Sequence, residues 1–119
     1  MLDFTGDIDA LRIPEEKAQR LAEAALFLDR ARAAELRDAE MAVALDGNLQ
    51  LWVMIRTLAE GADSAVSGSL RTNLTKLCDY VARTTLREGV SIDDDSLDSL
   101  ININLCIAEG LVEGARQAA

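Results

Sequence analysis

Apolar residues recur at helical spacing over most of this chain, and this periodicity constrains the fold more than any other feature. From Pro14 to about Leu45 an apolar side chain returns every three or four positions, and no glycine interrupts the run. Such spacing gives an α-helix one apolar stripe. Proline is favoured in a first helical turn, and Glu15 and Glu16 complement the positive end of the helix dipole. We therefore expect a long first helix over residues 14–45, after a flexible lead-in at residues 1–13.

The middle of this stripe and the segment after it leave two points open. Residues 30–35 are polar and alanine-rich, so they are either solvent-exposed or await a partner. Asp46-Gly47-Asn48 is either a turn or a tolerated break within a helix. The periodicity passes through it in register, which favours a helix that continues or restarts. Residues 49–55 are apolar on nearly every side, and without a second strand candidate they favour a buried helix.

Two more helices follow. The small-residue loop 61–69 precedes a helix expected from Leu70 to about Glu88, with Ser67 or Ser69 as its N-cap. Gly89 stands where a left-handed C-cap residue belongs.

Three consecutive aspartates, residues 93–95, suit the start of a final helix from about Ser96 to Gln117. They lack the spacing, central glycine and terminal glutamate of an EF-hand calcium loop. Short loops favour antiparallel neighbours, so we predict an all-α antiparallel bundle of about four helices. The first helix is long, and residues 14–119 form a single domain.

Charge and composition narrow the function. The 119 residues include 21 Asp and Glu against 12 Lys and Arg, a net charge of −9. This charge repels phosphate backbones and anionic membranes and leaves a protein as the expected partner, unless it serves solubility alone. The chain has no histidine, so a Ser–His–Asp or Cys–His site cannot be built, and no phosphate-binding loop is present. We expect a non-catalytic protein that needs no cofactor and no metal.

Cysteine usage and the N-terminus indicate a cytoplasmic location. Cys78 and Cys106 lie among apolar residues at helical spacing and, without histidine, cannot form a four-ligand zinc site. Buried free thiols in a reducing compartment are the expectation. Met1 to Phe4 show no signal-peptide pattern, and charged or amide residues interrupt every apolar stretch before it reaches membrane-spanning length.

Three residues are candidates for binding. Trp52, the single tryptophan, is either an ordinary core aromatic or an anchor for an incoming helix. Asn104 falls on the apolar stripe of the last helix, where it either specifies the packing of the bundle or bonds a ligand backbone. Gly110 either frays the helix end or permits a close helix approach.

Three segments of the sequence resemble the FlaF family of bacterial flagellar biosynthesis regulators. Leu45-Asp46-Gly47-Asn48-Leu49-Gln50-Leu51-Trp52 is similar to its L-D-x-N-x-x-L-W element. Leu70-Arg71, with Leu74, Leu77, Val81, Arg83 and Thr84, resembles its central helix. Leu100-Ile101-Asn102-Ile103-Asn104, with Ile107, Glu109, Gly110 and Leu111, resembles its closing element, although Asn102 stands where the family usually has Asp. The blocks keep family order over about residues 42 to 112.

The resemblance implies a cytoplasmic chaperone that binds flagellin and supports its synthesis or secretion, alongside an FlbT-like regulator. The alternatives are a structural helical scaffold that pairs with a second copy, without a flagellin client, and an RNA-binding regulator. The expected protein-binding residues are Asn48, Leu51, Trp52, Ile55, Ile101, Asn104 and Gly110.

Overall fold

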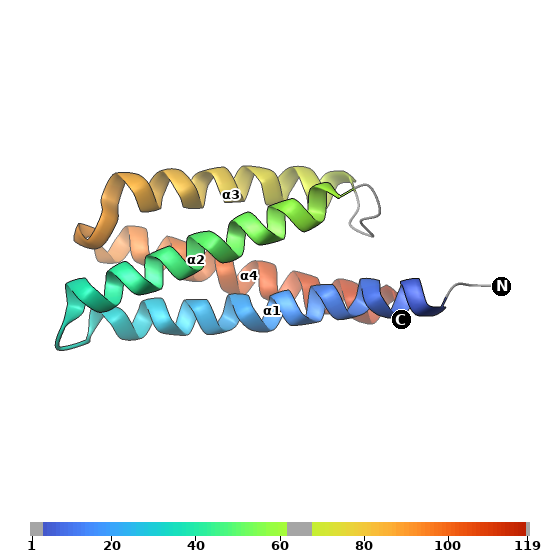
Figure 1. Ribbon diagram of the computed structural model, residues 1–119, viewed down its shortest axis with the longest axis horizontal. Helices are drawn as coiled ribbons and strands as arrows, with labels where there is room; N and C mark the ends of the chain where they lie inside the picture. The colour runs from blue at the N-terminus through green and yellow to red at the C-terminus, as the bar shows by residue number, and fades with distance from the viewer. Residues whose placement is uncertain (1–3, 62–67, 119) are drawn as a thin grey trace.

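A computed structural model describes the backbone of residues 4–61 and 68–118, and the side chains of residues 15–61, 68–69 and 71–113. Four helices follow one another along the chain: α1 (Phe4–Arg32), α2 (Arg37–Glu60), α3 (Gly68–Glu88) and α4 (Asp94–Ala118), with a 3-10 turn η1 (Gly89–Ser91) before the last. They run up and down in an elongated bundle of 55 × 22 × 18 Å (Figure 1). The prediction of an all-α antiparallel bundle with a long first helix is confirmed.

The bounds of the first helix differ from the prediction at both ends. α1 begins at Phe4 and runs through Pro14, so the expected start at Pro14 is wrong. The spacing of Phe4, Ile8 and Leu11 is helical and extends the pattern backwards, which outweighs proline's preference for a first turn. Residues 1–3 of the expected lead-in lie outside the described residues.

The chain also turns within the stretch expected to be one continuous helix. α1 ends at Arg32 and α2 starts at Arg37, so residues 33–36 form a turn. The Ala33 and Ala34 amides bond the carbonyls three residues back, at 3.2 Å each, which tightens the end of α1. Arg37 then donates to the backbone carbonyls of Val90 (2.7 Å) and Ile92 (3.0 Å), holding the start of α2 against η1.

α2 runs unbroken through Asp46-Gly47-Asn48, so these residues lie within a continuous helix and do not form a turn. α3 starts at Gly68, and Gly89 after it adopts a left-handed φ of +56°, as a C-cap glycine should. Residues 62–67 of the predicted loop, Ser67 among them, lie outside the described residues.

The aspartate run begins α4 as expected. The Asp93 carboxylate accepts the Ser96 backbone amide at 2.7 Å, in the manner of an N-cap, and this bond lowers the pKa of Asp93. Asp94 and Asp98 on the first turns of α4 pair with Arg32 at 3.3 and 2.6 Å, tying the end of α1 to the start of α4.

The core runs along the axis of the bundle. Its completely buried large side chains come from all four helices and from Ile92 beyond η1: Leu21, Leu28, Met41, Trp52, Leu74, Val81, Ile92, Leu97 and Leu100. α1 packs most extensively along α4, less along α2, and α3 lies mainly against α2.

The two thiols differ in exposure. Both cysteines are free, and Cys78 is buried, which raises the pKa of its thiol. Cys106 is exposed, so the expectation that both are buried is wrong for this one. Its neighbours Leu105 and Ile107 are apolar in sequence, but position 106 falls on the outer side of α4.

Candidate functional site

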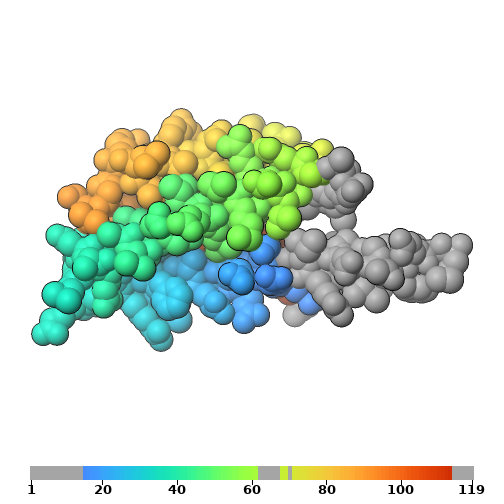
Figure 2. Space-filling model, in the orientation of Figure 1, coloured from blue at the N-terminus to red at the C-terminus, as the bar shows by residue number. Residues whose placement is uncertain are grey.

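α1 and α2 leave an open groove between them along one face of the bundle. In the space-filling view the two helices lie side by side on the front face, with α3 beyond α2 (Figure 2). The groove has a volume of about 790 Å³. Its lining comes from both helices: Arg20, Glu23, Ala24, Phe27, Arg30, Ala31, Ala39, Glu40, Val43, Ala44, Gly47, Asn48 and Leu51.

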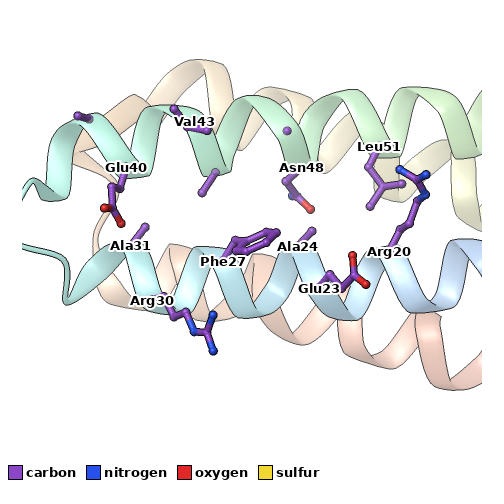
Figure 3. A pocket seen from close by; sticks show the side chains of 13 residues that line it. Arg20, Glu23, Ala24, Phe27, Arg30, Ala31, Glu40, Val43, Asn48 and Leu51 are labelled. Carbon is purple, nitrogen blue, oxygen red and sulfur yellow. The ribbon is translucent and has the colours of Figure 1, made fainter.

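Small side chains keep this groove open. Four alanines and Gly47 line it, and a Cβ added to Gly47 would meet no atom within 4 Å. Phe27 from α1 lies in the space between the two helices (Figure 3) and Val43 from α2 lines the groove, yet they remain 56% and 75% exposed. Large apolar side chains exposed next to a hollow are typical of a surface that binds a partner.

Charges at this surface balance. The lining contains Arg20 and Arg30 together with Glu23 and Glu40, two of each sign, in a chain of net charge −9. Arg20 pairs with Glu16 at 3.4 Å, and Figure 3 shows Arg30 directed away from the space between the helices. The groove therefore presents an apolar and nearly neutral surface on an otherwise acidic protein.

A chain of buried polar groups lies in the core and reaches the groove at Asn48. The Trp52 indole donates to Asn104 Oδ1 at 2.8 Å, and Asn104 Nδ2 donates to Asn48 Oδ1 at 2.7 Å and to the Leu21 carbonyl at 3.2 Å. Trp52 and Asn104 are 0% exposed and Asn48 is 1% exposed. These bonds join α1, α2 and α4 at one level of the bundle. Asn48 points from α2 into the space between α1 and α2 (Figure 3).

The direction of this chain follows from the indole. An indole N–H can only donate, so it fixes the carboxamide oxygen of Asn104 as its acceptor and turns the Asn104 amide towards Asn48. Asn48 must then accept with its oxygen, which leaves its own buried Nδ2 without a hydrogen-bond partner. A buried donor left unpaired costs about 1–3 kcal/mol. Such an atom requires an explanation, and a ligand acceptor is one.

The outer side of α2 continues the apolar surface beyond the groove. Val53, Met54 and Leu58 are 39–49% exposed, although α2 also buries Leu45, Trp52 and Ile55 on its inner side. Among the described side chains, α2 thus carries more exposed large apolar residues than any other helix.

The predicted binding residues separate into three groups. Asn48 and Leu51 line the groove. Trp52, Ile55 and Asn104 are buried, so they can affect a partner only through the residues that they position. Ile101, which is partly buried, and Gly110, which is exposed, lie on α4 and do not line the groove.

The α1 side of the groove was missed. Ala24 and Phe27 were not singled out, because they become groove residues only when α1 folds back against α2 at residues 33–36. The one available signal was the polar, alanine-rich stretch at residues 30–35.

Neither metal binding nor membrane crossing has support among the residues with described structure. No three His, Cys, Asp or Glu side chains there are grouped so that they could hold a metal ion. None of the described helices combines the length and apolar character that a bilayer span requires.

The fold and the groove define a class: an up-and-down helical bundle with an open, apolar groove between its first two helices. Comparison with protein families then places the chain. The family model for flagellar protein FlaF matches residues 10–111, which cover nearly all of α1 to α4. The chain belongs to the FlaF family of flagellar proteins. No curated protein and no solved structure matches it.

Proposed function

We propose that this protein is a non-catalytic chaperone that binds flagellin in the cytoplasm and supports its synthesis or secretion. Membership of the FlaF family supports a flagellar role. The observation that carries the proposal is the groove between α1 and α2, where Phe27 and Val43 are exposed beside small residues. A groove between two helices suits an amphipathic helix of a client, which lays its apolar face between them.

The charges disfavour a second copy as the occupant. The groove is nearly neutral, so it neither attracts nor repels an apolar client face. A second copy brings a further net charge of −9 to the contact, which opposes self-association. Covering the apolar face of a flagellin helix would keep flagellin monomeric until export, which is the physical benefit of such a chaperone.

The test places one charged side chain in the groove. Gly47→Glu adds bulk and charge to open space in α2, and it replaces a poor helix former with a good one, so the fold should be retained. Gly110→Glu is the matched control, because Gly110 is an exposed glycine of α4 with equally open space around it. Binding to purified monomeric flagellin of the same organism is measured by titration calorimetry.

We expect the wild type and Gly110→Glu to bind alike, and Gly47→Glu to bind at least about tenfold more weakly, a loss of about 1.4 kcal/mol. A wild-type chain that does not bind flagellin would overturn the proposal. Selective loss in Gly110→Glu would instead place the binding surface on α4. A tight dimer in sedimentation that ignores flagellin would favour the scaffold alternative.

A further inference from the structure

We propose that the free Nδ2–H of Asn48 donates a hydrogen bond to one acceptor on the docked helix, and that Trp52 and Asn104 are positioning residues that orient this donor. This inference rests on the proposed function and adds the chemistry of recognition to it. The occupant is an amphipathic helix of flagellin whose apolar face carries one oxygen acceptor. That acceptor is a side-chain oxygen of Asn, Gln, Ser or Thr, or a carbonyl freed by a local bend.

The observations behind the inference are the burial and the hydrogen bonds of Asn48 where it lines the groove. Asn48 is 1% exposed, lines the groove, and its Nδ2 has no partner although its Oδ1 is bonded. The donor-only indole of Trp52 fixes both amides, so the free group is a donor and not an acceptor. The site therefore favours a client helix that presents an oxygen acceptor to Asn48, and disfavours one that presents an N–H donor there.

The position of Asn48 also bears on the register in which the client helix docks. Its neighbour Gly47 has no side chain and lines the groove, so the backbone of an incoming helix can approach α2 closely at this level. Phe27 of α1, which also lines the groove, is 56% exposed. A single buried polar contact within an apolar face fixes the register of helix pairing, since a slipped helix leaves the polar group unpaired. Asn48 would thus select one register of the client helix.

A first experiment observes the donor in the wild-type protein. Uniformly ¹⁵N-labelled protein is titrated with unlabelled monomeric flagellin, and the side-chain NH2 resonances of Asn48 are followed by NMR. We expect a downfield shift of one Asn48 amide proton and slower exchange with water on binding. The exposed amide of Asn102 on α4 is the internal control and should not shift. Unchanged Asn48 side-chain resonances in a saturated complex would overturn the inference.

A second experiment removes the donor. Asn48→Leu keeps the approximate volume but removes both the Nδ2–H donor and the Oδ1 that accepts from Asn104, and we expect it to bind flagellin about tenfold to a hundredfold more weakly. Asn102→Leu makes the same change on the exposed side of α4 and should bind as the wild type does. Leu74→Ala on α3 controls for lost stability, because Leu74 is buried away from the groove lining. Equal binding by Asn48→Leu and the wild type would contradict the inference.

Trp52→Phe tests the positioning role. Without the indole donor, the Asn104 amide is free to reverse and to accept from Asn48 Nδ2. We then expect the Asn48 side-chain resonances of the unbound protein to move to hydrogen-bonded positions, and flagellin affinity to fall. A loss of affinity with unchanged Asn48 resonances would assign Trp52 a purely structural role.

The outcomes separate the two proposals. If the wild type does not bind flagellin, the proposed function fails. If the wild type binds, but Asn48 neither shifts nor matters, only the hydrogen-bond inference fails.

Discussion

α1 meets a neighbour on each side, and the two contacts differ in how they are filled. Along α4 the contact is closed: Leu21 and Leu28 of α1 and Leu97 and Leu100 of α4 are completely buried, and Arg32 binds Asp98 at its end. Along α2 alanines and a glycine leave a groove with exposed apolar side chains. The contact with α4 stabilises the fold, whereas the contact with α2 gives up packing and keeps an apolar surface available.

Truncation should therefore have very different effects in the two contacts. Leu28→Ala empties a fully buried position, so we expect the free energy of unfolding to fall by about 2–5 kcal/mol. Val43→Ala, in the groove, should change it by less than about 0.5 kcal/mol. Urea unfolding followed by circular dichroism measures both. Similar losses in the two variants would mean that the groove is a packed part of the core.

The buried chain of Trp52, Asn104 and Asn48 stabilises the fold as well as reaching the groove at Asn48. Asn104→Leu leaves the Trp52 indole and the Leu21 carbonyl without their side-chain partner. We expect a loss of about 1–3 kcal/mol in urea unfolding, because buried polar groups are then left unpaired. A variant as stable as the wild type would show that these groups find other partners.

Substitutions of two glycines should have smaller effects on stability and test whether the groove is open at Gly47. Gly47 is helical with open space at its Cβ position, so Gly47→Ala should stabilise the protein by about 0.5–1 kcal/mol. Gly89 has a φ of +56°, so Gly89→Ala should destabilise it by about 1–2 kcal/mol. Thermal unfolding compares the two variants directly. A stability loss in Gly47→Ala would indicate that the groove is less open than described.

The smallest expected effect is a pH dependence at the start of α4. The Ser96 amide lowers the pKa of Asp93 in the folded state, so this stabilisation is present above the unfolded value of about 3.9. It is lost as the pH falls through the lower, folded value. Asp93→Asn keeps a capping oxygen but does not titrate, so its thermal midpoint should fall less between about pH 5 and pH 3. Identical pH profiles of the thermal midpoint in the wild type and Asp93→Asn would show that Asp93 does not contribute to this pH dependence.

Sequence periodicity predicted most of the fold. α3 and α4 start two residues before the expected positions, and Gly89 adopts the expected conformation. The turn at residues 33–36 was missed because Ala33, Ala34, Glu35 and Leu36 are all good helix formers, so local propensity carries no signal of a break. What holds the turn is distant in sequence: Arg37 bonds carbonyls of residues 90 and 92.

The candidate site could be predicted only in part, because some of its residues meet through contacts that are distant in sequence. Asn48 and Leu51 could be found because a single helix carries them with the family-like motif. The opposite wall, with Ala24 and Phe27, depends on the missed turn. Whether Trp52 and Asn104 face a partner or the core is decided by how three helices meet, and no single segment encodes that arrangement.

The central claim is that the surface between α1 and α2 is the one that binds flagellin. Chemical-shift mapping of labelled protein with unlabelled monomeric flagellin tests it most directly. We predict the largest changes at Ala24, Phe27, Val43 and Gly47, with little change at the exposed residues of α3 such as Asn73 and Leu86. Changes concentrated on α3 or α4, with the groove residues unaffected, would contradict the claim.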